Sequence, residues 1–166
     1  PGVVPAIVMA IEAFTKVGEQ VLIQPPVYYP FAAAIRNTGR KVITNPLLLG
    51  NLQYYIDFDD FEKKVKTCKL FILCNPHNPG GRVWSKEELE KLAAICLKYQ
   101  VLMISDEIHA DLTLPSYKHI SLASLSEEIA MNTVTFSSAS KTFNMAGLAK
   151  IGRASCREKC TSWCRS

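Results

Sequence analysis

Several features that mark other protein classes are missing from this chain of 166 residues. No apolar run approaches the roughly 20 residues that a membrane-spanning helix needs. The apolar segment at residues 1–10 has no basic region before it, unlike a secretory signal peptide. These absences predict a soluble, cytoplasmic protein with no membrane partner.

A strong charge of either sign is also missing. The formal net charge is +4, and residues 151–166 hold four basic residues against the single acid Glu158. The remainder is nearly neutral, so we predict that the protein has no nucleic acid partner.

Paired cysteine motifs are absent as well. Cys68, Cys74 and Cys96 lie scattered along the chain, and we expect them to be buried or reduced thiols of a cytosolic protein. Three further cysteines crowd residues 156–164, but no histidine or CxxC pair accompanies them. This spacing is only a weak indication of metal binding, and we predict no metal site.

Residues 151–166, IGRASCREKCTSWCRS, differ in character from the rest of the chain. They lack apolar periodicity and are rich in arginine and cysteine. The first eight, IGRASCRE, resemble one reading frame of a widely used sequencing adapter. Our hypothesis is that the natural reading frame ends near Ala149 or Lys150 and that residues 151–166 are a non-native, disordered tail. An in-frame genomic match to residues 151–166 would contradict it.

The preceding part, residues 1–150, alternates helical and strand patterns without repeats, low-complexity stretches or a linker, which predicts one α/β domain with a largely parallel sheet. The predicted helices span residues 5–14, 29–37, 57–65 and 85–99, and the predicted strands span residues 20–24, 41–44, 69–74, 101–105 and 133–136. Residues 6–14 are apolar on nearly every face, which predicts a buried helix. The continuous apolar run KLFILC, residues 69–74, predicts a strand covered on both faces.

Three polar segments each follow a buried strand. They are NPHNPGG at residues 75–81, DEIHAD at 106–111 and SSASKTFN at 137–144. Ligands of open α/β sheets gather at the carboxyl ends of the strands, so we expect these segments to converge on one site.

Two residues in these segments suggest chemistry, although each has a simpler alternative. Lys141 follows the hydroxyl residues Ser137, Ser138 and Ser140, which suit contact with a phosphate. Most lysines are solvated surface residues, but burial beside a cofactor would lower the pKa of the amine and make it a nucleophile. Asp106 ends an apolar strand, where it is either a helix cap or turn former, or a buried carboxylate that holds a pyridinium nitrogen protonated.

In order and spacing, the three segments resemble the hallmark segments of fold-type-I pyridoxal-phosphate enzymes. The motifs SDEIH and SKTFN, the latter followed by AGL, are most similar to those of the carbon–sulfur β-lyases, namely the cystathionine β-lyases and their maltose-regulon-modulator relatives. Gly2-Val3-Val4-Pro5 also resembles that branch, and the resemblance covers residues 1–149. It implies pyridoxal 5'-phosphate as cofactor. It also implies a three-layer α/β/α arrangement with a mostly parallel sheet, as part of the large domain of the aspartate-aminotransferase fold.

The resemblance implies a chemical role for two of these residues. Lys141 would be the Schiff-base lysine and the base that moves the α proton of the substrate. Asp106 would pair with the ring nitrogen of the cofactor. The family pattern assigns no chemistry to Glu107 or Asp111, which we expect to be structural.

The remaining implied contacts hold the cofactor. Asn78 would hydrogen-bond its phenolic oxygen, and His109, one helical turn after Asp106, would support the same side. Tyr28 would stack on the ring, the alternative being a core tyrosine. The phosphate would be held by the hydroxyl of Ser138 and by backbone amides at a helix start, those of Val3 and Val4.

The resemblance implies a β-lyase that cleaves cystathionine or another cysteine conjugate to a thiol, pyruvate and ammonia, and that works as a homodimer. An aminotransferase of class I/II is the alternative, and a cofactor-binding regulatory protein is a second one. Ala149 stands where many aminotransferases of this fold place a basic phosphate clamp, which favours the lyase. The chain starts and stops inside the family domain, so we expect residues 1–166 alone to be inactive, with exposed strand edges at residues 101–105 or 133–136.

Overall fold

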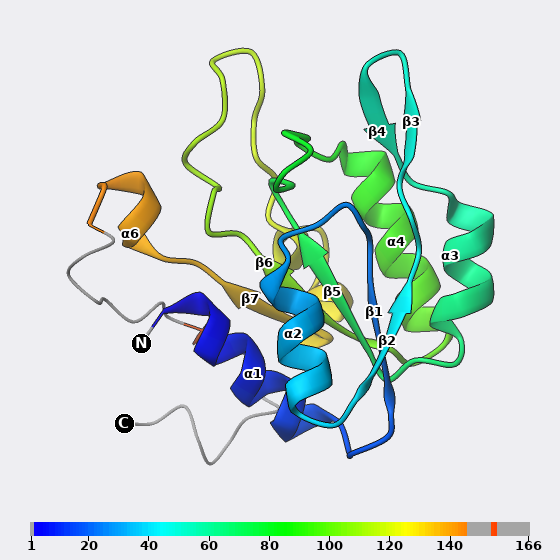
Figure 1. The fold of residues 1–166 in the computed structure, drawn as a ribbon. Coiled ribbons are helices and arrows are strands. Elements are labelled where there is room, and N and C mark those ends of the chain that lie inside the picture. Colours follow the sequence, from blue (N-terminus) through cyan, green and yellow to red (C-terminus); the bar gives the residue numbers. More distant parts are fainter. Residues whose placement is uncertain (1, 146–153, 156–166) are drawn as a thin grey trace.

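The computed structural model describes residues 2–145 and the backbone of residues 154–155 (Figure 1). The strands are β1 Gln20–Ile23, β2 Lys41–Thr44, β3 Leu48–Gly50, β4 Gln53–Tyr55, β5 Leu70–Cys74, β6 Leu102–Asp106, β7 Thr133–Phe136 and β8 Ala154–Ser155. The helices are α1 Val3–Phe14, α2 Pro30–Asn37, α3 Phe58–Val65, α4 Lys86–Lys98, the 3₁₀ turn η1 Leu122–Ser124, α5 Glu127–Met131 and α6 Ala139–Thr142.

The central sheet has the strand order β2-β1-β5-β6-β7-β8. All pairs from β2 to β7 are parallel, and only β8 runs antiparallel to its neighbour. The carboxyl ends of the parallel strands therefore point the same way, and we call that side the carboxyl edge and the opposite side the amino edge. The hairpin of β3 and β4 and the long connection after β6 both rise above the carboxyl edge (Figure 1).

Strand β5 explains why the sheet is covered on both faces. Its side chains alternate between two apolar cores: Leu70, Ile72 and Cys74 pack with α1 and α2, whereas Phe71 and Leu73 pack with α3 and α4. All five are buried, as the unbroken apolar run requires. The predicted three-layer α/β/α arrangement is confirmed.

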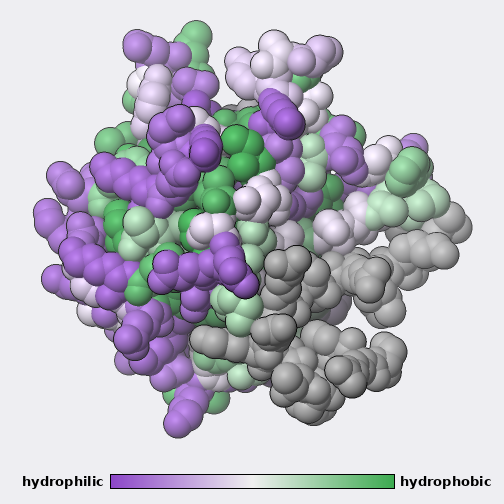
Figure 2. Space-filling view, turned by 180° about the vertical axis from the view of Figure 1, so that it is seen from behind, coloured by the Kyte–Doolittle hydropathy of each residue, from purple (hydrophilic) through white to green (hydrophobic). Residues whose placement is uncertain are grey.

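Helices α3 and α4, which cover one face of the sheet, begin where their sequence signals predict. Asp57 caps α3, because its side chain accepts a hydrogen bond from the Asp60 amide at 3.0 Å. The predicted capping box of Ser85 and Glu88 starts α4. The outward faces of α3 and α4 are charged, and hydrophilic side chains dominate that part of the surface (Figure 2, left).

The structure corrects two expectations and adds one element that the sequence analysis did not predict. Helix α1 is not buried all round: Val3, Ile7 and Ile11 face the sheet, but Met9 on the opposite side is 65% exposed, because α1 lies in an outer layer. Strand β6 has no exposed edge, since it pairs with both β5 and β7. The β3–β4 hairpin was not predicted at all, because its strands are only three residues long and show no extended alternation of apolar and polar residues.

Other expectations concern the thiols and the last part of the chain. Cys68, Cys74 and Cys96 are buried and unpaired, as predicted. Of the proposed non-native tail, the structure describes only β8, and the cysteines at 156–164 lie outside the described residues. No helix in the described part has both the length and the apolar character to cross a membrane.

Candidate active site

The three polar segments predicted to converge leave adjacent strands at the same level. Cys74 is in register with Asp106, and Asp106 is in register with Phe136. Two hydrogen bonds continue the sheet one residue further, from the Asn75 amide to the Asp106 carbonyl at 2.9 Å and from the Glu107 amide to the Phe136 carbonyl at 2.8 Å. The ends of β5, β6 and β7 therefore form one continuous edge, and the predicted convergence is confirmed.

The turn after β5 places Asn78. The indole N–H of Trp84 donates to the Cys74 carbonyl at 3.0 Å, and the Asn78 amide donates to the Cys74 sulfur at 3.3 Å. Burial raises the pKa of the Cys74 thiol to about 12, so it stays protonated and inert. His77 lies buried beneath the turn, where loss of hydration lowers its pKa to about 4. The Cys74 and His77 side chains beneath the turn are therefore uncharged near neutral pH. The side chain of Asn78 is half-buried.

Asp106, the last residue of β6, is a buried carboxylate. It is 4% exposed, and burial raises its pKa to about 6, opposed by a hydrogen bond from the Ile108 amide and reinforced by the nearby Glu107 carboxylate. Within the described residues, the Ile108 amide at 3.2 Å is the one donor to this carboxylate. Such a group is poorly compensated by the protein alone and suits a cationic partner.

The segments after β6 and β7 meet beyond the sheet. His109 is half-buried in a hydrogen-bonded turn rather than a helix, and its pKa is lowered by burial and by the charge of Lys141. The hydroxyl of Thr142 donates to Asp111 at 2.8 Å, which ties α6 to the same turn. Asp111 is therefore structural, as expected. Lys141 itself is exposed, so the burial expected beside a cofactor is not supplied by the described residues.

Two hydroxyls gather at the start of α6. The Ser138 oxygen accepts from the Ser140 amide at 3.2 Å and lies 2.9 Å from the Ser140 oxygen. Both side chains are half-buried. The Ser138 hydroxyl donates to the Ser140 oxygen in this arrangement, and small hydroxyl groups that can rotate fit the contact with phosphate oxygens that the sequence suggested.

The other predicted phosphate ligands lie at the start of α1. Its N-cap is Gly2 with φ 110°, a conformation that favours glycine, and no side chain caps the helix. The amides of Val3 and Val4 thus belong to a first turn that has no side-chain acceptor. Helix α1 packs on the sheet, and its start lies on the same side of the molecule as α6 (Figure 1, left).

Tyr28 follows the carboxyl end of β1. Its ring is half-buried, lies edge-on to Phe31 with centroids 5.8 Å apart, and contacts Tyr29 at 5.6 Å. It packs against the same apolar core as Ile108. No hydrogen bond among the described residues joins Tyr28, Val3 or Val4 to Asp106, so their place in the site rests on the shared edge alone.

A cavity of about 480 Å³ opens beside the site. Asn78 and His109 both line it, so the structure brings these two predicted residues together. Its other walls come from the turn after β5 and from Leu112, Leu114 and Tyr117 in the connection after β6. A ligand held by Asn78 and His109 would extend into a space lined by both polar and apolar side chains.

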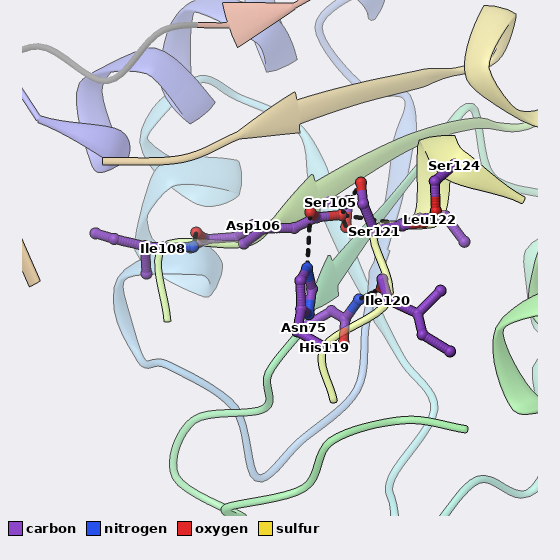
Figure 3. A network of polar contacts seen from close by, with 10 residues as sticks. Asn75, Ser105, Asp106, Ile108, His119, Ile120, Ser121, Leu122 and Ser124 are labelled. Carbon is purple, nitrogen blue, oxygen red and sulfur yellow. Dashed lines mark hydrogen bonds and ion pairs between the residues drawn. The ribbon is translucent and has the colours of Figure 1, made fainter. Parts of the chain in front are cut away.

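One polar cluster at this edge was missed by the sequence analysis. Glu107 accepts hydrogen bonds from Ser105 and, across the long connection, from His119 and Ser121. Figure 3 shows His119 and Ser121 beside the ends of β5 and β6. No sequence signal identifies such a pairing, because the partners are twelve and fourteen residues from Glu107.

Comparison with known proteins decides the family. The sequence model of the family "Aminotransferase class I and II" matches residues 1–166. The chain belongs to this family. The predicted family and the aspartate-aminotransferase type of fold are thereby confirmed.

Individual relatives refine this assignment. Cystathionine beta-lyase PatB of Bacillus subtilis is 53% identical over 150 residues, which cover 89% of this chain and 39% of the relative. The aspartate aminotransferase of Pyrococcus abyssi is 34% identical over 143 residues, covering 86% and 36%. The crystal structure of cystalysin from Treponema denticola, which contains a pyridoxal 5'-phosphate cofactor, superposes with a TM-score of 0.90 at 47% identity, covering 94% and 40%. The chain thus spans about two fifths of the length of these relatives.

Proposed function

We propose that this chain is the cofactor-binding part of a pyridoxal-phosphate-dependent carbon–sulfur β-lyase. One observation carries the proposal: the carboxyl edge unites a buried carboxylate, Asp106, with Asn78 and His109 at one cavity and with the segment that bears Lys141. The similarity to a cystathionine beta-lyase, 53% against 34% for an aspartate aminotransferase, supports the lyase reading.

The donor set at this edge fits the cofactor. Asp106 is buried with a single protein donor and matches a protonated ring nitrogen. The hydroxyl of Ser138 and the uncapped amides of Val3 and Val4 match phosphate oxygens. Asn78 and His109 offer polar atoms for a ring oxygen, and Tyr28 offers an aromatic face.

Lys141 and Asp106 have different roles in the proposed chemistry. Pyridoxal phosphate, when bound, supplies an electron sink for the substrate's α carbon. Lys141 provides the amine for covalent attachment and moves the proton at the α carbon, while Asp106 keeps a proton on the ring nitrogen. Cysteine conjugates such as cystathionine would be cleaved with water to a thiol, pyruvate and ammonia.

The same proposal covers the rest of the protein. Residues 1–150 form part of the large cofactor-binding domain, and residues 151–166 are a non-native tail. The complete enzyme takes a small amino-acid substrate, acts in the cytoplasm and assembles as a homodimer, as the family resemblance implies.

A pyruvate-release assay with cystathionine, run on the complete protein beside a transamination assay with keto acids, tests the proposal. We expect pyruvate formation that depends on added pyridoxal phosphate and is lost in Lys141→Ala. Transamination without pyruvate release would instead establish an aminotransferase, since the two activities occur on the same fold. A biological effect that persists in Lys141→Ala would point to a regulatory protein.

A further inference from the structure

Glu107 is a buried acid that the proposed chemistry does not use. It directly follows Asp106 and is 5% exposed. One carboxylate oxygen accepts from the Ser105 hydroxyl at 2.8 Å, from the Ser121 hydroxyl at 3.1 Å and from the Leu122 amide at 3.1 Å. The other lies 2.9 Å from Nε2 of His119. A buried carboxylate with this many hydrogen bonds keeps the surrounding segments in fixed positions.

These hydrogen bonds attach the far end of the long connection after β6 to the sheet. Residues 108–118 leave the carboxyl edge, line the cavity with His109 and return to the sheet at residues 119–122 (Figures 1 and 3). Asn75 holds the returning segment of this connection from the other side, since its side-chain amide donates to the Ile120 carbonyl at 2.9 Å. The connection is thus fastened to the ends of both β5 and β6.

The fastening is not optimised for stability alone. Oδ1 of Asn75 and Nδ1 of His119 are both buried without a hydrogen-bond partner among the described residues. Buried polar atoms without partners cost free energy and are uncommon outside functional sites. The cluster therefore fixes the connection at a local cost in free energy.

We propose that Glu107 and His119 are positioning residues for the cofactor site. Together with Ser121 they clamp the connection of residues 108–118, which fixes His109 against Asn78 and fixes the backbone that presents Asp106. This inference rests on the proposed cofactor, and it assigns Glu107 a role through geometry rather than through proton transfer. In Glu107→Gln, the carboxamide that replaces the carboxylate keeps the length of the side chain and can retain most of these hydrogen bonds, whereas Glu107→Ala removes all of them.

The test uses the complete protein and three readouts: the dissociation constant of pyridoxal phosphate from its visible absorbance, tryptic cleavage after the exposed Lys118 in the cofactor-free form, and turnover. For Glu107→Ala we expect the cofactor dissociation constant to rise by about tenfold, because small displacements of site groups have large effects. Cleavage after Lys118 should become faster, and kcat should fall more than KM rises. Glu107→Gln should restore all three toward the wild type.

Thr133→Val is the matched control, since it removes a buried hydrogen bond at the amino edge. It should lower thermal stability without changing the cofactor dissociation constant or the cleavage after Lys118. If Glu107→Ala does not fold, the double variant His119→Gln/Ser121→Ala takes its place. We then expect the cofactor dissociation constant to rise by about threefold, with the other two readouts changing in the same directions. Unchanged cofactor binding and cleavage in these clamp variants would overturn the inference. A wild-type protein that binds no pyridoxal phosphate would instead overturn the proposed function, while the cleavage readout would still test the clamp.

Discussion

The two edges of the parallel sheet treat buried polar groups differently. At the amino edge, the buried hydroxyls of Thr15 and Thr133 each donate to a carbonyl four residues earlier, and the Thr15 hydroxyl also accepts from the Arg40 side chain. At the carboxyl edge, Asp106 has one donor, and buried atoms of Asn75 and His77 have no partner among the described residues. These two hydroxyls at the amino edge are therefore satisfied within the protein, whereas the carboxyl edge keeps binding capacity for groups from outside the described chain.

The difference shows where this fold separates stability from function. Strand β5 is apolar on both faces up to Cys74, and polar residues begin immediately beyond it. Removing polar groups at the amino edge should thus affect folding, and removing them at the carboxyl edge should affect chemistry more than folding. The following substitutions sharpen or break that contrast.

Lys141→Ala should have the largest effect. Turnover by the complete protein should fall by at least about a thousandfold, because both covalent attachment and proton movement are lost. Cofactor held through Asp106 and the phosphate contacts should remain but detach on denaturation. Borohydride reduction followed by peptide mapping checks the assignment: the wild type should carry its label on Lys141, and a label on any other lysine would refute it.

Asp106→Asn should lower turnover by about a hundredfold while the fold is kept. An amide cannot stabilise the protonated ring nitrogen, although its oxygen can still accept from the Ile108 amide. Steady-state kinetics and far-ultraviolet circular dichroism measure the two effects separately. Near-normal turnover with unchanged cofactor affinity would remove Asp106 from the site.

The same substitution should stabilise the cofactor-free protein in a pH-dependent way. The pKa of Asp106 is about 6 in the folded chain against an ordinary 3.8, so the folded state binds the proton more tightly than the unfolded state. Wild-type stability therefore falls as pH rises through this window, and the full penalty is present above it. The difference in unfolding midpoint between Asp106→Asn and the wild type should grow between pH 3.8 and about 6 and then level off. A difference that does not vary with pH would contradict a buried, poorly compensated carboxylate.

Thr133→Val should have the smallest effect and no chemical one. Loss of its hydrogen bond to the Ile129 carbonyl at 2.7 Å should reduce the free energy of unfolding by about 1 kcal/mol. Denaturant titration measures this change, and pyridoxal-phosphate titration should give the wild-type affinity. Weakened cofactor binding in this variant would mean that the two edges are not independent.

Local patterns were sufficient for the main helices and strands. Residues 41–44 were predicted with the observed bounds, and the capping box at Ser85 fixed the start of α4 within one residue. The hairpin of β3 and β4 escaped prediction because it has little apolar periodicity and its strands pair mainly with each other. The one-sided burial of α1 was also beyond the sequence, since an all-round apolar pattern does not say which face meets the sheet.

The sequence by itself determined the family, the order of the main helices and strands up to β7, and the residues that its motifs supply, among them Asp106 and Lys141. Each of these depends on neighbours within a few positions, where periodicity and short motifs carry information. Only the tertiary structure decided that Asp106 is buried with one donor, that Asn78 and His109 share a cavity, and that Glu107 contacts a distant segment. These facts depend on the register of parallel strands and on the path of a long connection, which bring together side chains that no local pattern links.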